Sequence, residues 1–469
     1  MQLSFPFKTK KRDLDLSLGL EALYPRVFLM WLSLFLGYCL FCANWLIFSK
    51  LKGSNGSGGW NEDFQAISTG VTEEAVNYSV TIARGVFTIP ASMILVKLGY
   101  KRACLLAFGL STIALPLIFS PHWTVLILGR LIMAAGGTLT IIYISPLLAK
   151  LAMPEKKQKL AMLNGFTYAI SGLIVNVLFM IQPVSTFLIQ NWKWVAASVA
   201  TFSFFPLILF YFCGENFEIV SLSEKLRVGV PENYSTLLRE KESWVWIITY
   251  SGMLVVSILC SSFVPRRLTT LVPMLSSSIA GMEWSSLYTV IFFIGTFCGL
   301  YFLGRLNPKD IKRTSIARFS IALVLILWAL IALFTLITHF AKSNGFAIFA
   351  NILIFISTFF LAFFGLGIQS VLLYIPLEYK DYTPQKTSIF FSCLWGIGYI
   401  ILTGYYILAS VIDQCVHQIA SLTFITILLV IYYLLVVRLR ESRSEYMEFK
   451  DWLKENIFSR KKSVLEKLT

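Results

Sequence analysis

The chain has 469 residues, of which 57% are hydrophobic, 15% aromatic and 14% charged, and its net charge is +15 at neutral pH. Soluble domains carry about 25% charged residues, so this composition excludes an ordinary water-soluble domain, whose surface would be apolar almost everywhere. The net charge alone would suit nucleic-acid binding, but the basic residues lie in short loops between long apolar blocks, so we expect a lipid bilayer as partner and no nucleic acid.

Twelve apolar blocks are long enough to cross a bilayer, which takes about 20 residues per helix. In chain order, the predicted spans cover residues 27–49, 75–96, 103–120, 124–148, 160–182, 194–213, 244–270, 284–304, 315–338, 346–377, 387–411 and 416–437. The block 103–120 is short for a span, and 346–377 is long enough to tilt or bend. No cleavable signal peptide is expected, because the first apolar run is a full span. The predicted fold class is an all-α polytopic membrane protein with twelve transmembrane helices.

The spans fall into two sets of six. We expect a cytoplasmic N-terminal segment over 1–26, a six-helix bundle over 27–213, a cytoplasmic central loop over 214–243, a second six-helix bundle over 244–437 and a basic cytoplasmic tail over 438–469. Most of the 40 lysine and arginine residues lie in the termini, the central loop and alternate short loops. Cytoplasmic loops carry the excess of basic residues, so both termini are predicted to be cytoplasmic. The expected location is a plasma or cell membrane.

The two halves of the chain resemble each other. TEEAVNYSVTIARGVF (72–87) aligns without gaps with MEWSSLYTVIFFIGTF (282–297), and YISPLLAKLAMPEKK (143–157) shares its Tyr-Ile and its proline spacing with YIPLEYKDYTPQK (374–386). The repeated segments occupy the same ordinal positions, in spans 2 and 8 and at the ends of spans 4 and 10. Tandem six-span halves are typical of secondary transporters, which bind substrate at mid-membrane between the halves. The expected architecture is therefore two pseudo-symmetric six-helix bundles.

Short motifs resemble those of the major facilitator superfamily (MFS). SMILVKLGYKR (92–102) after span 2 is similar to the superfamily's G-x-x-x-D-[RK]-x-G-[RK]-[RK], although Val96 replaces the aspartate. LGRLIMAAGG (128–137) resembles R-x-x-x-G-x-G, and NWKW (191–194) is similar to Gly-Trp-Arg-Trp. The resemblance covers about residues 27–437 and implies the MFS fold, solute transport by alternating access and no enzymatic activity. A phosphate-binding loop of an ATPase is absent from the sequence.

Two arginines lie within apolar spans. Arg84 is near the midpoint of span 2, and Arg130 lies in span 4. A charge at the bilayer centre costs about 2.5–3.5 kcal/mol on insertion scales, so such residues normally face a polar cavity. Arginine keeps its charge and offers a planar fork that matches a carboxylate or a phosphate. Structural alternatives are that Arg130 bonds to neighbouring backbone and that Arg84 reaches outward or pairs with a helix C-terminus.

Acidic residues are missing from the middle of every predicted span, and the three histidines, at positions 122, 339 and 417, map to the outer side of the membrane. Proton symport commonly needs a titratable group inside the membrane, and a transported cation needs a buried carboxylate. We therefore predict a small anionic substrate, organic or phosphorylated, with Arg84 binding its acidic group and without proton coupling. An antiporter or a facilitator fits this prediction.

The candidate substrate-binding residues combine these arginines with polar and aromatic side chains of the spans that line the central cavity in the superfamily. They are Arg84, Arg130, Tyr38, Asn44, Tyr168, Tyr250, Gln369, Trp395 and Tyr399. No catalytic residue, cofactor or metal is expected, and the protein is expected to be a monomer.

The repeated proline segments are predicted to form a cytoplasmic gate. The candidate gating residues are Lys97, Gly99, Lys101, Arg102, Pro146, Lys150, Pro154, Lys156, Lys157, Pro376, Glu378, Asp381 and Pro384. Proline ends or bends a helix, and the acidic residues of the second copy would face the lysines of the first. The sequence predicts ion pairs between Glu378 or Asp381 and Lys150, Lys156 or Lys157 in the outward-open state.

Other functions stay open. If Arg84 were structural, the chain would transport a neutral solute such as a sugar or nucleoside. Alternatively, the chain would be a receptor or scaffold of the same fold, which binds a ligand without transporting it. Organophosphate exchangers, which the chain resembles at superfamily level, have an arginine in span 1 that this chain lacks. Nitrate porters have arginines in spans 2 and 8, but Ile294 lies opposite Arg84 in the repeat alignment. A membrane enzyme is disfavoured because the sequence shows neither a metal cluster nor a nucleophile–base set.

Overall fold

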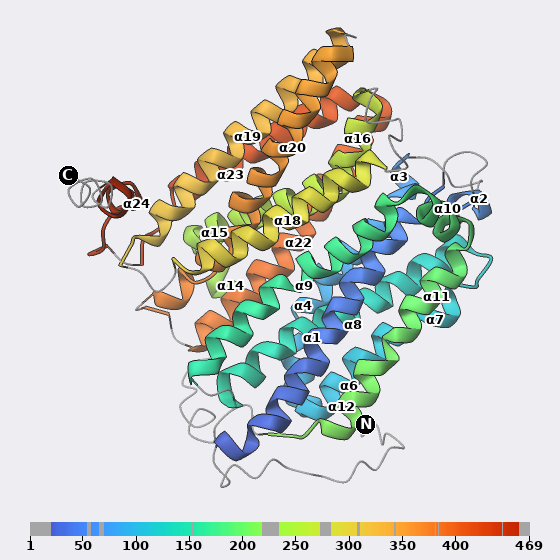
Figure 1. The fold of residues 1–469 in the computed structure, drawn as a ribbon. Helices are drawn as coiled ribbons and strands as arrows, with labels where there is room; N and C mark the ends of the chain where they lie inside the picture. Colours follow the sequence, from blue (N-terminus) through green and yellow to red (C-terminus); the bar gives the residue numbers. More distant parts are fainter. Residues whose placement is uncertain are drawn as a thin grey trace, which may run out of the picture.

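A computed structural model describes residues 20–53, 58–64, 70–151, 154–217, 234–272, 283–306, 310–341, 344–379, 381–382, 384–442 and 444–458. Helices make up most of these residues (Figure 1), and no strand is assigned among them; Ile311 and Met447 form an isolated bridge. The predicted all-α fold class is therefore confirmed.

The first half of the chain folds into helices that correspond to predicted spans 1 to 6. They are α1 (Leu20–Lys50), α2 (Trp60–Asp63), α3 (Gly70–Glu73), α4 (Ala75–Thr88), α5 (Ala91–Leu98), α6 (Tyr100–Thr112), α7 (Ala114–Leu117), α8 (Trp123–Leu151), α9 (Pro154–Met180), α10 (Gln182–Gln190), α11 (Trp192–Phe202) and α12 (Phe204–Cys213).

The second half contains the counterparts of spans 7 to 12 and part of the tail. They are α14 (Tyr234–Leu237), α15 (Lys241–Leu254), η3 (Val255–Phe263), α16 (Val264–Leu271), α18 (Trp284–Gly304), α19 (Arg313–Ala341), α20 (Asn344–Gly367), α21 (Gln369–Leu372), η4 (Pro376–Glu378), α22 (Pro384–Cys415), α23 (Gln418–Val437), α24 (Phe449–Leu453) and η5 (Lys454–Phe458).

The described residues contain 10 helical runs that are long and apolar enough to cross a membrane, or 11 with the bent pair α4–α5 counted as one span. The remaining predicted span, 103–120, corresponds to α6 and α7, which are individually too short. The bend of 57° between α4 and α5 falls at Pro90, which lacks the N–H that a continuous helix requires. The twelve-span prediction is consistent with this arrangement.

Gly99, like Gly58 and Gly59, has a positive φ, a backbone conformation that other residues rarely adopt. Gly99 turns α5 into α6 with φ 77°, and the side chain of Asn216 accepts a hydrogen bond from the Lys101 N–H at 3.0 Å just beyond it. The glycine retained in the predicted loop motif therefore allows the sharp reversal between two spans.

Two pairs of helices join the halves along the middle of the molecule (Figure 1). Helix α4 packs against α22, and α9 packs against α18. The α4–α22 contact is closest at Gly85 and Gly396, where a Cβ on Gly396 would lie 3.1 Å from the Gly85 carbonyl oxygen. Glycine at both positions lets the two backbones touch.

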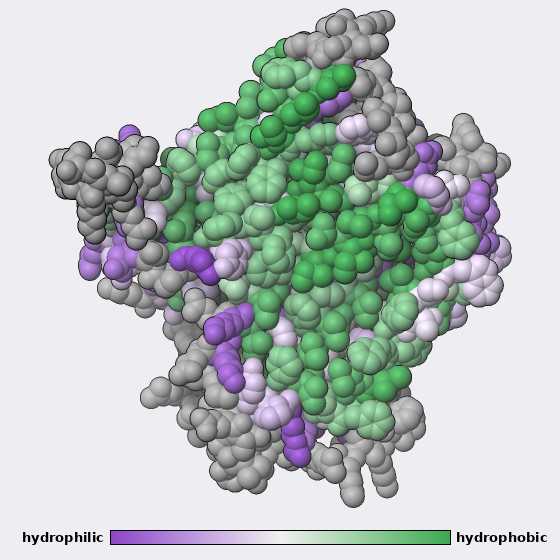
Figure 2. Space-filling view, viewed as in Figure 1, coloured by the Kyte–Doolittle hydropathy of each residue, from purple (hydrophilic) through white to green (hydrophobic). Residues whose placement is uncertain are grey.

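The surface is apolar around its middle (Figure 2), where green residues cover the face of both halves. Large apolar side chains near the ends of the spans are exposed too, such as Phe212, Phe340 and Trp194, which are 75%, 71% and 69% exposed. An apolar patch this extensive would not remain in water, so the belt is the lipid-facing surface of a multi-pass integral membrane protein.

The two ends of the molecule differ in what they carry. Figure 1 places α3, α10 and α16 at one end, here named the α16 end, and α14 and α24 at the other, here named the α24 end. At the α24 end the tail docks on α19: Phe449 packs against Phe319 with ring centroids 5.3 Å apart. Lys312 lies 2.9 Å from Glu448 there, and its hydrogen bond holds the pKa of that carboxyl below the usual value.

Candidate functional site

A cavity lies between the two halves and is lined by side chains from both. About 60 Å³ of it is open to the centres of water molecules, which is room for about four or five waters or a small solute. Aromatic side chains dominate the lining: Tyr38 and Trp45 from α1, Tyr168 from α9, Tyr250 from α15, and Trp395 and Tyr399 from α22. The polar lining residues are Arg84, Ser257, Thr296 and Gln369. The cavity therefore offers stacking surfaces, a few hydrogen-bonding groups and one positive charge.

Arg84 lies at the wall of this cavity in an aromatic enclosure. Its side chain is 3% exposed, and Nη2 donates a hydrogen bond to the hydroxyl of Tyr38 at 2.8 Å. The guanidinium carbon is 4.5 Å from the ring centroid of Tyr399 and 5.8 Å from that of Trp45. Ring faces attract a cation by about 2 kcal/mol or more where water is excluded, so the enclosure offsets part of the cost of burying this charge.

The charge of Arg84 has no carboxylate partner among the described residues. None of their ion pairs includes Arg84, and its buried Nε–H has no hydrogen-bond acceptor. Burying an arginine without a counterion is costly, and a bound anion would remove that cost. The free N–H and the open cavity next to it suit the acidic group of a ligand.

The other cavity residues hold each other in place. Tyr250 stacks on Trp395 with ring centroids 5.9 Å apart, and Gly398 leaves the room that Tyr250 occupies. The hydroxyl of Tyr168 lies 3.2 Å from that of Ser261. These contacts leave flat aromatic faces directed at the cavity from both halves.

The structure brings most of the predicted substrate-binding residues together. The cavity is lined by Arg84, Tyr38, Tyr168, Tyr250, Gln369, Trp395 and Tyr399, but not by Asn44 or Arg130. Those two line a separate small cavity beside α8. Arg130 is bonded to backbone there: its Nε donates to the Val76 carbonyl at 3.1 Å, and its guanidinium lies 4.3 Å from the ring centroid of Phe48. This geometry matches the structural alternative for Arg130.

Among the aromatic and hydrogen-bonding lining residues, sequence reasoning missed three: Trp45, Ser257 and Thr296. Trp45 lies seven positions after Tyr38 in α1, and helical periodicity places these two residues on one face. That spacing could have identified it. Ser257 and Thr296 lie within apolar stretches of the sequence. Nothing in the sequence distinguishes them from neighbouring residues that pack in the core, so only the structure identifies them as lining residues.

The predicted gating residues all belong to the α24 end. Lys97 lies in the last turn of α5, Gly99 follows that helix, and Lys101 and Arg102 lie in the first turn of α6. Of the prolines, Pro146 lies inside α8, which continues to Leu151, whereas Pro154, Pro376 and Pro384 begin α9, η4 and α22.

The charged members of the predicted gate have other partners in this structure. Glu378 binds Arg313 through two hydrogen bonds of 2.6 and 2.8 Å, and Asp381 pairs with Arg440 at 3.2 Å. Lys156 lies 3.7 Å from the ring centroid of Tyr24. The side chains of Lys150 and Lys157 fall outside the described part of the chain, so the ion pairs predicted for the outward-open state stay a prediction.

Known proteins with similar sequences and folds were compared with the chain. Residues 126–414 match the family of Mycoplasma MFS transporters. A protein of Mesomycoplasma hyopneumoniae is 25% identical over 426 residues, which are 88% of this chain and 86% of that protein. A major facilitator superfamily transporter of Mycoplasma pneumoniae is 23% identical over 481 residues, covering 81% of this chain and 85% of the relative.

Solved structures share the fold at low sequence identity. A D-xylose–proton symporter has a TM-score of 0.65 at 15% identity, covering 90% of this chain and 100% of its own. A nucleoside transporter has a TM-score of 0.61 at 14% identity, covering 88% of this chain and 98% of its own. Together with the match over residues 126–414, these similarities show that the chain belongs to the Mycoplasma MFS transporter family and has the MFS fold.

Proposed function

We propose that the protein carries a small organic or phosphorylated anion across the membrane by alternating access, with Arg84 binding the acidic group. The observation that supports this most directly is a buried guanidinium that faces a cavity between the halves and has no carboxylate partner within the described part of the chain. This transport needs no covalent step, so we propose that the protein is a carrier and not an enzyme. Because one chain supplies both walls of the cavity, the proposed working unit is a monomer.

The dimensions and chemistry of the cavity support a small anion. About 60 Å³ of open space fits a few heavy atoms, and the planar guanidinium binds a carboxylate or phosphate group in two places at once. The aromatic faces of Tyr250 and Trp395 would cover the apolar part of such a solute. Low local polarity strengthens the ionic contact, because few waters remain to screen it.

The proposed location is the plasma or cell membrane, with the α24 end in the cytoplasm. Basic residues gather at that end, including Lys97, Arg102, Arg305 and Lys312, and cytoplasmic loops carry such an excess. Both chain termini would then be cytoplasmic. The α16 end would face outward.

The proposed mode is exchange of anions without proton coupling. Among the described residues, the middles of the spans contain no aspartate or glutamate that could carry a proton across. An imposed proton gradient should therefore leave the rate of anion exchange unchanged in proteoliposomes. A strong acceleration by inward-directed protons would contradict this part of the proposal.

The central test replaces Arg84. We expect Arg84→Ala to lower anion uptake at least tenfold at equal surface amounts. Arg84→Lys should retain part of the uptake with a higher KM, because it keeps the charge but loses the planar fork. Anions from a ligand panel should raise the melting temperature of the purified wild type and not that of Arg84→Ala. Arg305→Ala, which removes an exposed arginine at the α24 end, is the matched control and should transport normally.

The second candidate function is transport of a neutral solute with Arg84 structural. Six aromatic side chains line the cavity, and such faces also bind the ring of a sugar or a nucleobase. In that case neutral ligands would stabilise the wild type and folded Arg84→Ala equally. A protein that binds ligands but shows no counterflow in proteoliposomes would instead be a receptor or scaffold.

A further inference from the structure

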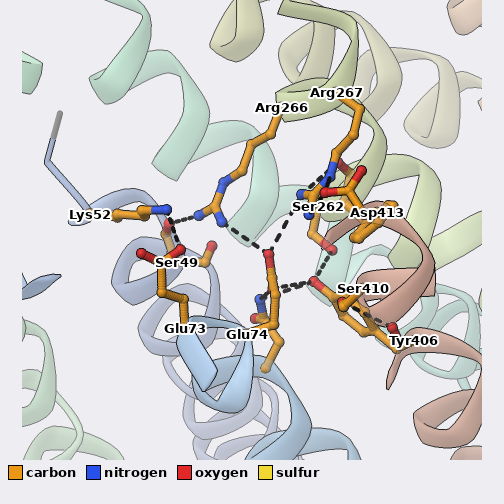
Figure 3. Close-up of polar contacts among 12 residues, drawn as sticks. Ser49, Lys52, Glu73, Glu74, Ser262, Arg266, Arg267, Tyr406, Ser410 and Asp413 are labelled. Atoms are coloured by element: carbon orange, nitrogen blue, oxygen red, sulfur yellow. Dashed lines mark hydrogen bonds and ion pairs between the residues drawn. The ribbon is translucent and has the colours of Figure 1, made fainter. Parts of the chain in front are cut away.

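A cluster of charged side chains joins the two halves at the α16 end, away from the central cavity (Figure 3). We name it the Glu74 cluster and define it as Glu74, Arg266, Arg267, Tyr406 and Asp413. Glu74 stands at the start of α4 in the first half, and the other four residues belong to α16 and α22 of the second half. Sequence analysis did not connect these residues with one another.

Glu74 is enclosed by groups from the opposite half. Its side chain is 3% exposed, and Oε1 lies 3.2 Å from Nη1 of Arg266 and 3.6 Å from Nη1 of Arg267. The other oxygen, Oε2, accepts hydrogen bonds of 2.8 Å from the Tyr406 hydroxyl and from the side-chain amide of Asn77. The carboxylate is thus fully solvated by protein groups, three of which come from the second half.

The two arginines differ in what they hold besides Glu74. Arg267 is 10% exposed and has its own carboxylate within the second half, since its Nη2 lies 3.0 Å from Asp413. Arg266 is 31% exposed, and Glu74 is its one carboxylate partner among the described ion pairs. Its Nη2 also donates to the carbonyl of Ser49 at the end of α1, which adds a second contact with the first half.

Further contacts between the halves surround the cluster. The ammonium group of Lys50 lies 3.2 Å from the Ser286 hydroxyl, and the Val71 N–H donates to the side chain of Gln414 at 3.1 Å. Glu74 precedes Arg84 by ten residues, so the cluster lies about 15 Å along the α4 axis from the cavity charge. The cluster therefore joins the two halves on the α16 side of Arg84.

We propose that Glu74 is a tethered carboxylate that occupies Arg266 while the α16 end is closed, and that the acidic group of the substrate takes its place when this end opens. Separation of the halves removes Glu74 from both arginines. Arg267 then retains Asp413, whereas Arg266 becomes a free cation at the mouth of the pathway. Arg266 would be the first binding site for a carboxylate or phosphate arriving from the α16 end. The role of Arg266 in binding substrate rests on the anionic substrate proposed above. The role of the Glu74–Arg266 contact as a gate does not depend on that substrate.

The proposed role of the Glu74–Arg266 contact as a gate is tested without any substrate. Ser257, which lines the cavity, is changed to cysteine in a background where the exposed Cys415 is replaced by serine. The labelling rate is then measured with a membrane-impermeant thiol reagent applied from the α16 side. We expect Glu74→Gln and Arg266→Gln each to raise the rate several-fold. Because both changes break the Glu74–Arg266 contact, the double variant should raise the rate by less than the two single effects combined.

Glu73→Gln is the matched control for labelling. Glu73 is the neighbouring glutamate, but it pairs with Lys52 of the same half, so its loss should leave the labelling rate unchanged. Melting temperatures confirm that each variant is folded. An unchanged labelling rate in folded Glu74→Gln would overturn the proposed gate, and so would an equal increase of the labelling rate in Glu73→Gln.

The proposed role of Arg266 in binding substrate is tested by comparing two variants that both disrupt the Glu74 cluster. Glu74→Gln leaves Arg266 free to bind an anion, whereas Arg266→Gln removes that charge. At low concentrations of an anion that stabilises the wild type, initial uptake by Glu74→Gln should exceed that by Arg266→Gln several-fold, and added salt should reduce the difference. Equal uptake by the two variants would overturn the role of Arg266. If no anion stabilises the wild type, the proposed function fails, and the labelling result still decides the gate.

Discussion

At the scale of single residues, the surroundings of a charge decide its role. Arg84 and Arg130 are both buried arginines in apolar spans, and each lies over an aromatic ring. Arg130 differs because backbone carbonyls of Val76 and Trp45 accept its N–H groups. Arg84 has the Tyr38 hydroxyl and the cavity instead. Only the second arrangement leaves a cation available to a ligand.

The hydrogen bond between Arg84 and Tyr38 leads to a prediction. Tyr38→Phe removes an acceptor from a buried charged donor, so we expect a loss of about 1–3 kcal/mol in the unliganded protein. A bound anion supplies the missing acceptor, so ligand should raise the melting temperature of Tyr38→Phe more than that of the wild type. Tyr168→Phe is the control, because the Tyr168 hydroxyl pairs with Ser261 and not with Arg84. Equal ligand responses in both variants would contradict this role for Tyr38.

The depth of Arg84 could be predicted from the sequence, but its neighbours could not. Its position near the middle of an apolar run is a local property, and local reasoning found it. The ring of Tyr399 lies more than three hundred positions away in the chain, on a helix of the other half. The same limitation left Arg130 ambiguous, since its carbonyl acceptors come from α1 and from the start of α4.

At the scale of helices, close backbone packing joins the halves. The contact of α4 with α22 depends on Gly85 and Gly396, and the hydroxyls of Thr81, about one turn from Gly85, and Thr403, about two turns from Gly396, meet at 2.8 Å. Helices without side chains at the crossing can approach and slide, which a moving interface requires. Apolar length predicted the helices, but it did not predict the bend at Pro90 or the division of span 3 into α6 and α7.

The tight crossing makes glycine substitutions informative. Gly396→Val places methyl groups against the Gly85 carbonyl oxygen and the side chain of Ile89, so α4 and α22 must separate. We expect loss of transport and a lower melting temperature. Gly404→Val lies two turns along the same helix, where a Cβ would meet nothing within 4 Å, and it should transport normally. Normal transport by Gly396→Val would show that the crossing tolerates a wider separation.

At the scale of the whole molecule, the two halves meet around a cavity and are tied together at the α16 end. The two-bundle architecture and the pairing of spans 2 and 8 as repeats followed from the sequence, because an internal repeat is visible in a single chain. The Glu74 cluster was not foreseen. Glu74 and Arg266 are 192 positions apart in the chain, and each residue taken alone resembles an ordinary charged residue at a helix end.

Charge counting over the whole carrier gives a further prediction. With a bound monoanion the Arg84 site is neutral, so the loaded carrier should reorient without moving net charge, whereas the empty carrier moves one positive charge. We expect anion exchange in proteoliposomes to be insensitive to an imposed potassium diffusion potential and net uptake to be slowed when the inside is negative. Equal sensitivity of both modes would contradict a single uncompensated charge at the site.

The uncompensated guanidinium thus links the carrier to the membrane potential. A full crossing of one elementary charge is worth about 2.3 kcal/mol for each 100 mV, and Arg84 near the bilayer centre experiences a fraction of that. In a cell that is negative inside, the empty site is drawn toward the cytoplasm and waits there for an internal anion. One arginine without a counterion would then favour electroneutral exchange over net accumulation, with no separate coupling ion.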